Sequence, residues 1–440
     1  MPASLNGDRR ARDAVARSTG KTPRRAAGRR LALAAACAAL AAGPVRPANA
    51  HGAEPSAVTH VLFVGDSFTH GRYDPVRRFA GGFDAGPGAA DGSHVHDLLC
   101  LAAATCSAAE AVLPNDPDRV AYPAGDDTLP AKLGFLLANP ADQYAEAGPY
   151  GGVPGIVLRL AAEARVPLDV SILTVSASSL GGKNLGGSRK NAPLIESDRW
   201  DRVVLQEKSS LPLPAQVVVA GRTVPTKGDP AAFASGVAAI VSGIDAADRA
   251  AGRAPIPVTL FQTPPMASYG YVSDDPALPL YGTSYGSPGT AAAPYVGAAD
   301  PMAQMESDLR ASYRAVAAGW NAQNPTGSRI TVSPVGDAWI TAMRLGVAVR
   351  DPYVASRRFG TVDLWDSDIL DACCTVPIGY HPSSAGAYLD ALVLFGTISG
   401  RDTVFFGPND PVARALGIPA AAAVGLQAAA SLTLRERPAG

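Results

Sequence analysis

Two residues far apart in the chain could together perform nucleophilic chemistry. Ser67 stands in a Gly-Asp-Ser turn that directly follows the apolar run 61–64, and His381 stands in a Gly-Tyr-His-Pro-Ser loop near the other end of the chain. A serine hydroxyl is a poor nucleophile at neutral pH unless an imidazole accepts its proton, so a reactive serine needs a histidine close to it in space. Ser67 and His381 are the candidate nucleophile and base. The alternative for the tripeptide alone is an ordinary turn and helix N-cap.

The elements around these residues predict how they are positioned. Four apolar residues ended by Gly65 are typical of a buried parallel strand, and the small residues after it suit a turn into a helix. The first N–H groups of such a helix can hold an anion beside Ser67. Further strands are predicted around 168–175, 200–209, 258–263 and 330–335, and helices at 155–165, 231–251, 302–318 and 412–434. Strands alternating with helices from end to end predict one α/β domain with a five-stranded parallel sheet.

The two ends of the chain resemble the SGNH/GDSL-type serine hydrolase superfamily, which has a Gly-Asp-Ser block after the first strand and a His-Pro block near the end. The resemblance implies a three-layer α/β/α, flavodoxin-like fold, with Ser67 as the nucleophile and His381 as the base. It also implies an oxyanion hole. The family's backbone N–H donor is expected at Ala177 or Ser178, where Ala or Ser replaces the usual Gly, and Gln206 stands where the family usually has Asn.

The acid of the expected triad departs from the family pattern. The position three residues before His381 is Ile378, which can neither accept a hydrogen bond nor carry charge. The approach after Leu364-Trp365 favours Asp368, with an inserted loop from Ile369 to Gly379. Asp366 and Asp371 are rivals, and a Ser-His dyad oriented by a backbone carbonyl is also open.

The first fifty residues predict export. Residues 1–50 carry arginine pairs, an apolar stretch at 31–42 that is too short to span a bilayer, and Ala-Asn-Ala at the end. This is typical of a signal peptide, and the arginine pairs allow a twin-arginine route to the periplasm or the medium. Residues 51–440 then form a single SGNH-type domain. Lipid anchoring through Cys37 is the minority interpretation, so we expect no stable membrane anchor.

The net charge of the chain after the leader limits the kinds of partner it could bind. The leader holds ten of the 38 basic and two of the 39 acidic residues, which leaves the remainder at −9. An acidic secreted protein is a poor candidate for binding nucleic acid or anionic membranes.

Four cysteines remain after the leader, an even number that suits an oxidising compartment. Cys100 and Cys106 close a short loop and could pair, which would leave the adjacent Cys373 and Cys374 for a vicinal bond or another cross-link. Four cysteines allow three pairings, so the pairing stays open.

Two insertions exceed a minimal fold of this kind. Residues 72–150 follow the nucleophile turn and are expected to form a wall of the cleft; they include a His94-Val95-His96 pair that could ligate a metal but more readily lies in a solvated loop. Residues 264–300 carry five tyrosines that could stack on sugar rings: Tyr269, Tyr271, Tyr281, Tyr285 and Tyr295.

These features predict a secreted serine ester hydrolase that needs no cofactor and acts on a small-molecule or glycan ester, with carbohydrate O-acetyl and short-chain esters as the candidates. The alternative is a catalytically inactive glycan-binding protein on the same scaffold. A flavodoxin-like nucleotide or flavin binder is a third, minor interpretation. The acyl length, the alcohol part and the oligomeric state are not given by the sequence.

Overall fold

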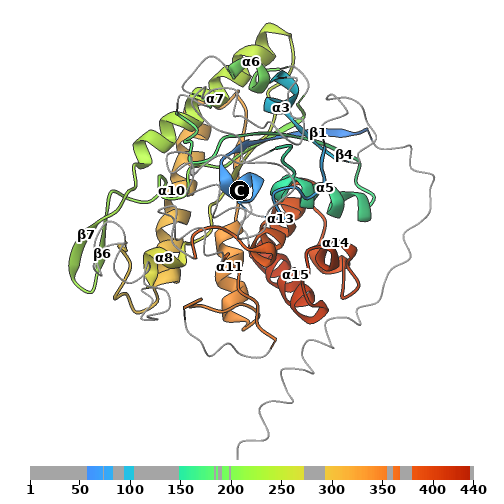
Figure 1. Ribbon diagram of the computed structural model, residues 1–440. Helices are drawn as coiled ribbons and strands as arrows, with labels where there is room; N and C mark the ends of the chain where they lie inside the picture. Colours follow the sequence, from blue (N-terminus) through green and yellow to red (C-terminus); the bar gives the residue numbers. More distant parts are fainter. Residues whose placement is uncertain are drawn as a thin grey trace, which may run out of the picture. The chain divides into compact units, whose positions relative to one another are not determined.

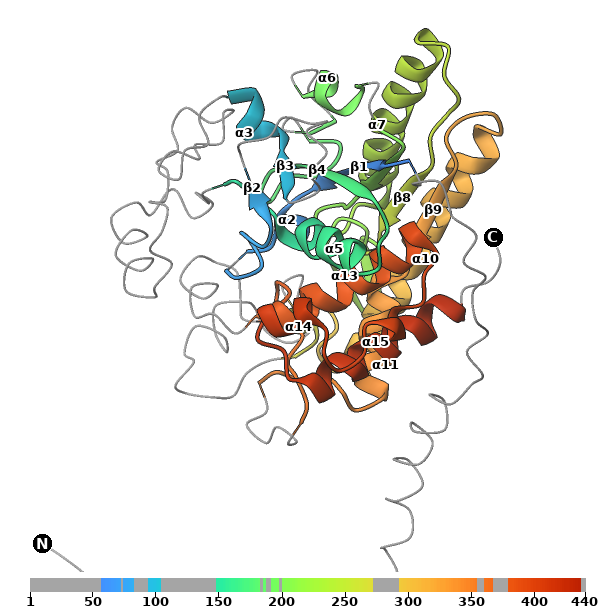
Figure 2. The ribbon, with the colours of Figure 1, turned by 90° about the vertical axis from the view of Figure 1, so that its right-hand side faces the viewer.

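The computed structural model describes residues 57–72, 74–82, 94–103, 148–182, 185–186, 191–197, 200–271, 293–353, 360–366 and 379–436. Within them a parallel sheet has the strand order β2-β3-β4-β1-β5-β8-β9. The strands are β1 (Thr59–Gly65), β2 (Gly81–Gly82), β3 (Val95–Asp97), β4 (Leu168–Thr174), β5 (Arg202–Leu205), β8 (Val258–Phe261) and β9 (Ile330–Ser333). Strand β1 is central, and Figure 2 shows it among its neighbours.

Helices cover both faces of the sheet (Figures 1 and 2). On one side lie α5 (Gly152–Glu163), α11 (Val335–Arg344), α13 (Ser384–Ser399) and α15 (Ala420–Arg435); α5 packs on β4 and α13, and α11 and α15 pack on α13 and on each other. The other carries α7 (Pro230–Ala250) and part of α10 (Pro301–Gln323). Shorter helices are α2 (Ser67–His70), α3 (Leu98–Ala103), α6 (Ala192–Ile195), α8 (Ala267–Gly270) and α14 (Pro411–Ala415).

The alternation of side chains along β1 explains the three layers. Val61 and Phe63 belong to the core under α5 and α13, whereas Leu62 and Val64 belong to the core under α7. Successive side chains of a strand point to opposite faces, so a strand covered on both faces is apolar throughout. The three-layer α/β/α fold predicted from the sequence is therefore confirmed.

The sheet is wider than predicted. All five predicted strands are present, but the insertion 72–150 contributes two more, β2 and β3, at one edge. A separate antiparallel hairpin, β6 (Gln216–Val219) with β7 (Arg222–Pro225), was not predicted either. These strands are short, and a pattern of two to four residues gives too little periodicity to identify a strand.

The predicted helices are found with shifted ends. Met305, Leu309 and Tyr313 on α10 are fully buried, as their spacing of four predicts. The predicted helix 412–434 is divided into α14 and α15 around Gly417 and Pro419. Helix α7 is long and apolar enough to span a membrane by length and composition alone; here its apolar side packs in the core.

Cys100 lies on α3 and is disulfide-bonded. The three other cysteines after the leader, Cys106, Cys373 and Cys374, lie outside the described residues, as does the predicted signal peptide. The disulfide pairing and the leader stay predictions.

Candidate active site

The turn after β1 presents Ser67 at the carboxyl edge of the sheet. Strand β1 ends at Gly65, Asp66 caps α2, and Ser67 is the first residue of that helix. The Asp66 carboxylate accepts a hydrogen bond from the Phe68 backbone N–H at 3.0 Å, which fixes the turn. The side chain of Ser67 therefore stands where the helix starts, while the N–H groups of Thr69 and His70 donate to the Asp66 carbonyl at 2.9 and 3.2 Å.

His381 faces this serine. The Ser67 Oγ and the His381 Nε2 lie 2.8 Å apart, within hydrogen-bond distance, although 314 residues separate them in the chain. Both side chains are at least 95% buried, and the Phe68 ring packs 5.3 Å from the imidazole ring. The structure thus brings together the two residues that the sequence indicates as nucleophile and base.

A short antiparallel ladder holds His381 in place. The Asp366 N–H donates to the His381 carbonyl at 2.8 Å, the Gly379 N–H donates to the Asp366 carbonyl at 3.2 Å, and Trp365 pairs with Pro382. The Ser383 hydroxyl caps α13 and also donates to the backbone of the other strand. The backbone of His381 is therefore held on both sides, by this ladder and by the long helix that follows it.

The hydrogen bonds of the ladder show where extra residues are inserted between the candidate acids and His381. Asp366 and Gly379 are hydrogen-bonded neighbours, so the chain between them, residues 367–378, connects two adjacent points. Without those residues the sequence would read Asp366-Gly379-Tyr380-His381, with an acid three positions before the histidine. The insertion was predicted to end at Gly379, but Gly379 belongs to the ladder. The preferred acid, Asp368, and its rival Asp371 lie outside the described residues.

Gln206 ties the nucleophile turn to β5. Its Oε1 accepts the Asp66 N–H at 2.9 Å and the Thr69 hydroxyl at 2.8 Å, and its Nε2 donates to the Glu207 carbonyl. A methyl group on Gly65 would lie 2.6 Å from this Oε1 and 2.4 Å from the Thr69 hydroxyl, so only glycine fits at that position. The side chain that was expected to serve an oxyanion thus holds the turn, and within the described residues only one of its two Nε2 hydrogens has an acceptor.

The loop after β4 brings a backbone N–H to the same edge. Ala177 has φ +56°, the left-handed conformation that glycine adopts most readily. This explains why a glycine is expected there. The Ser178 N–H donates to the Val175 carbonyl at 3.2 Å, whereas no acceptor within the described residues takes the N–H of Ala177 or that of Ser67.

Two buried carboxyl groups stand behind the serine. Burial raises the pKa of Asp66 to about 6, against the opposing hydrogen bond from Phe68. Burial raises the pKa of Glu207 to about 8, and the Asp66 carboxylate adds to the effect. Glu207 Oε1 accepts the N–H of Leu180 at 3.1 Å and that of Lys208 at 2.7 Å, so this side chain joins the loop that bears Ala177 to the end of β5. Sequence reasoning missed this role because an acid at a strand end is usually solvated.

Aromatic rings pack around His381, the candidate base. The Tyr380 ring lies 5.1 Å from the His381 ring and 5.7 Å from that of Phe68, and its hydroxyl is hydrogen-bonded to Ser209. Tyr380 is partly exposed. Tyr269 is buried against it, at 6.3 Å between ring centroids.

The prediction that the tyrosines of 264–300 stack on sugars is wrong for two of them. Tyr269 and Tyr295 are buried, with 3% and 0% of their surface exposed, and the Tyr295 hydroxyl donates to Asp308 at 2.8 Å. Both belong to the hydrophobic core, and the Tyr295 N–H donates to the Tyr269 carbonyl at 2.9 Å. Tyr271 is partly buried, and the remaining two lie outside the described residues.

The His94-Val95-His96 pair does not lie in a solvated loop. His96 is on β3, buried, with its Nε2 2.8 Å from one Asp169 oxygen, and the Nδ1 of His60 is 2.8 Å from the other. Burial raises the pKa of Asp169, but the hydrogen bonds from the two histidines outweigh it and lower the pKa below its usual value. Within the described residues no group of three or more His, Cys, Asp or Glu side chains has the arrangement of a metal site.

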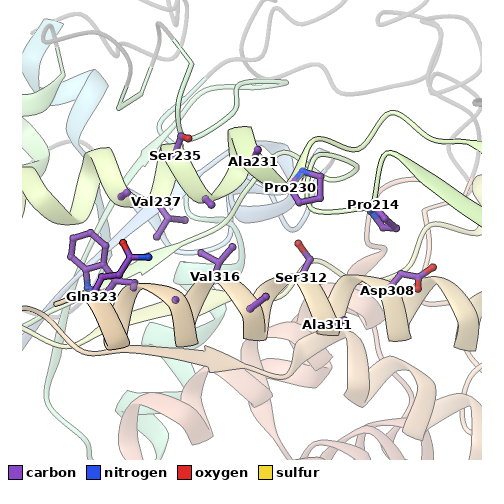
Figure 3. Close-up of a pocket in the computed structure, with 15 residues that line it drawn as sticks. Pro214, Pro230, Ala231, Ser235, Val237, Asp308, Ala311, Ser312, Val316 and Gln323 are labelled. Atoms are coloured by element: carbon purple, nitrogen blue, oxygen red, sulfur yellow. The ribbon is translucent and has the colours of Figure 1, made fainter. Parts of the chain in front are cut away.

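A groove of about 770 Å³ opens between α7 and α10 (Figure 3). Small side chains on the two helices line it, including Ala231, Ala234, Ala311 and Ala315, and neither Ser67 nor His381 is among its residues. Its one ionisable side chain, Asp308, is hydrogen-bonded to Tyr295. The groove therefore offers no second set of groups for nucleophilic chemistry.

No family model and no curated protein matches the chain. Among solved structures it is similar to a protein described as "a putative SGNH hydrolase from Slackia heliotrinireducens", with 14% identity, a TM-score of 0.34, and coverage of 78% of this chain and 100% of that one. It is also similar to a DUF4886 family protein from Bacteroides uniformis, with 12% identity, a TM-score of 0.40, and coverage of 86% of this chain and 96% of that one.

The raised pKa of Glu207 predicts that the fold becomes less stable as the pH rises. In the unfolded chain this carboxyl has its ordinary pKa of 4.5, and in the fold its pKa is about 8. The fold therefore binds the proton more tightly, and the free energy of unfolding falls as the pH rises between these values. Glu207→Gln keeps an acceptor for Leu180 and Lys208 but cannot ionise. We expect the free energy of unfolding of the variant, relative to that of the wild type, to rise by a few kcal/mol between pH 5 and pH 8, since a shift of one pKa unit is worth about 1.4 kcal/mol.

Urea unfolding at pH 5, 6.5 and 8 measures this difference. The exposed Glu436, at the end of α15, provides the control, and Glu436→Gln should show no change in the difference with pH. If the free energy of unfolding changed with pH by the same amount in the wild type and in Glu207→Gln, the account would be contradicted.

Proposed function

We propose that this protein is a secreted serine ester hydrolase that cleaves carboxylic esters by acyl transfer. The observation that carries the proposal is the 2.8 Å contact between the Ser67 Oγ and the His381 Nε2 at the carboxyl edge of a parallel sheet. In open α/β sheets ligands bind outside the carboxyl ends of the strands, at the point where the strand order reverses. Strand β1 lies at such a point, between β4 and β5.

The proposed reaction has two halves. His381 accepts the Ser67 proton as Oγ attacks the ester carbonyl, and the same imidazole then gives that proton to the departing alcohol. A water molecule, activated in turn by His381, attacks the acyl-serine and releases the acid, which regenerates Ser67.

Three donors suit the tetrahedral oxyanion. The backbone N–H groups of Ser67 and Ala177 have no acceptor within the described residues, which supports Ala177 over Ser178 for this role. The remaining Nε2 hydrogen of Gln206 is the third. Removing one such donor typically lowers kcat by a factor of about 100 to 1,000.

Asp366 is our proposal for the acid that orients His381. Its backbone is hydrogen-bonded to the backbone of His381, and it stands three positions before the histidine once residues 367–378 are left out. The chain would then carry the family's acid motif, interrupted by an insertion.

Secretion and the class of ester belong to the same proposal. The arginine pairs, the short apolar stretch and the Ala-Asn-Ala end of residues 1–50 support export. An exported hydrolase meets acetylated polysaccharides and other extracellular esters, and a short acyl group suits a nucleophile that is enclosed by buried residues.

Hydrolysis of chromogenic esters tests this function. We expect the mature protein to cleave 4-nitrophenyl acetate faster than 4-nitrophenyl octanoate, and Ser67→Ala and His381→Ala to lower kcat at least about 1,000-fold, because the nucleophile and the base act as a unit. Far-ultraviolet circular dichroism of each variant checks that the fold is kept. Equal rates in the wild type and Ser67→Ala, with 4-nitrophenyl esters and with acetylated xylan, would contradict the proposal and favour a glycan-binding protein.

Separate replacement of the three acids tests the assignment of Asp366. Asp366→Asn should lower kcat by a factor of about 10⁴ and leave KM within about threefold, because loss of the carboxylate leaves the imidazole in the wrong tautomer. Asp368→Asn and Asp371→Asn are the matched controls, with rates near that of the wild type. A loss of that size in either control, with an active Asp366→Asn, would transfer the role to that residue.

A further inference from the structure

His70 is a second histidine at the nucleophile turn, and the proposed reaction does not use it as an acid or a base. It is the last residue of α2, three positions after Ser67, and it is fully buried. Its ring stacks on that of Tyr150, with 4.3 Å between the ring centroids and 12° between the ring planes. A buried imidazole requires hydrogen-bond partners for its nitrogens, so those partners show what the side chain holds in place.

Both ring nitrogens of His70 face hydroxyl groups at the carboxyl end of β4. The Nδ1 lies 3.1 Å from the Thr174 Oγ1, and the Nε2 lies 3.3 Å from the Ser176 Oγ. Thr174 is the last residue of β4, and Ser176 directly precedes Ala177. A hydroxyl can donate or accept, so both contacts form whichever ring nitrogen carries the proton. His70 therefore joins the helix that begins with Ser67 to the loop that presents Ala177.

The conformation of Ala177 requires such a connection. Its φ of +56° costs free energy in a residue that has a side chain, and it persists only where the surrounding contacts fix the backbone. The Val175 N–H donates to the Gly65 carbonyl at 3.1 Å, which fixes the start of the loop to the end of β1. The contact between Ser176 and His70 then fixes the next residue of the loop to α2.

We propose that His70 is a positioning residue of the oxyanion hole: through Ser176 it holds the Ala177 N–H at the distance from the Ser67 N–H that the tetrahedral intermediate requires. The inference rests on the proposed function and adds a residue to the same site. An oxyanion donor is effective only about 2.7 to 3.1 Å from the developing charge. Loss of the contact should therefore destabilise the transition state and leave binding of the intact ester almost unchanged.

Two replacements of His70 separate its two contacts. The amide nitrogen of Gln takes the place of the imidazole Nε2, so His70→Gln keeps a partner for Ser176; that of Asn takes the place of Nδ1, so His70→Asn keeps one only for Thr174. With 4-nitrophenyl acetate we expect kcat to fall about 30-fold in His70→Asn and at most about threefold in His70→Gln, with KM within about twofold in both.

Ser176→Ala breaks the same contact from the other side and should reproduce the loss seen in His70→Asn. The matched control is Ser333→Ala, which removes a buried hydroxyl 3.0 Å from that of Thr397 and should keep the kcat of the wild type. Far-ultraviolet circular dichroism and the melting temperature check that each variant is folded. If His70→Asn does not fold, Ser176→Ala decides the question, and a wild-type kcat in it would overturn the proposal.

A double-mutant cycle tests whether His70 acts through Ser176. The combined variant His70→Asn, Ser176→Ala should have the kcat of either single variant, because both substitutions break one contact. Losses that multiply would overturn this role.

A tetrahedral adduct reports on the oxyanion hole without turnover. The Ser67 Oγ adds to the ketone carbon of 2,2,2-trifluoroacetophenone, its proton passes to His381, and the ketone oxygen becomes an oxyanion. The inhibition constant should rise in His70→Asn by the factor by which kcat falls, and a rise in KM with an unchanged inhibition constant would overturn the role.

The Ser67→Ala variant separates failure of this inference from failure of the proposed function. Hydrolysis that depends on Ser67 but proceeds at the wild-type kcat in His70→Asn and Ser176→Ala would overturn the positioning role alone. Equal rates in the wild type and Ser67→Ala would overturn the proposed function, and the oxyanion role of His70 with it.

Discussion

The contact between Ser67 and His381 sets the constraint that the rest of the structure satisfies. Two side chains 314 residues apart must stay within 2.8 Å of each other, and both are buried, so neither can be positioned by solvent-exposed loops alone. The serine is fixed by the end of the central strand and by the Asp66 cap, and the histidine by a ladder and by α13. Because α13 packs on α5, and α5 on β4 beside the serine strand, the two anchors belong to one packed body.

The edge of the sheet supplies the remaining groups in an order that the topology dictates. Parallel strands end at the same edge, so the neighbours of β1 deliver the Ala177 loop from β4 and Gln206 from β5. Gln206 links the turn that bears Ser67 to the end of β5, and Glu207 joins the loop after β4 to that same strand end. Position 65 must therefore be glycine, because any side chain there would collide with the Gln206 amide.

The fold class and the pairing of Ser67 with His381 could be predicted from the sequence because both depend on strong local signals. Five strands are apolar runs that end at small or polar residues, and Ser67 and His381 each stand where an element ends. The edge strands β2 and β3 were missed because they are too short for a period to show. Their core contacts come from residues distant in the chain, as with His96 against Asp169.

The acid could not be assigned from sequence for a related reason. Spacing along the chain is a guide to distance in space only while no insertion intervenes, and here residues 367–378 separate Asp366 from a ladder partner to which it is directly hydrogen-bonded. The same limit applies to the tyrosines. Composition alone cannot tell a ring that packs in the core, such as Tyr295, from one that is partly exposed, such as Tyr380.

Covalent trapping of the nucleophile tests the central claim most directly, because it needs no knowledge of the natural ester. The mature protein is incubated with a fluorophosphonate, which reacts with a serine hydroxyl when a neighbouring base accepts its proton. Intact-mass and peptide mass spectrometry then count and locate the adduct. The account predicts one phosphonyl group per chain, on Ser67, with none in His381→Ala. An unlabelled wild type, or an adduct on another residue, would contradict it.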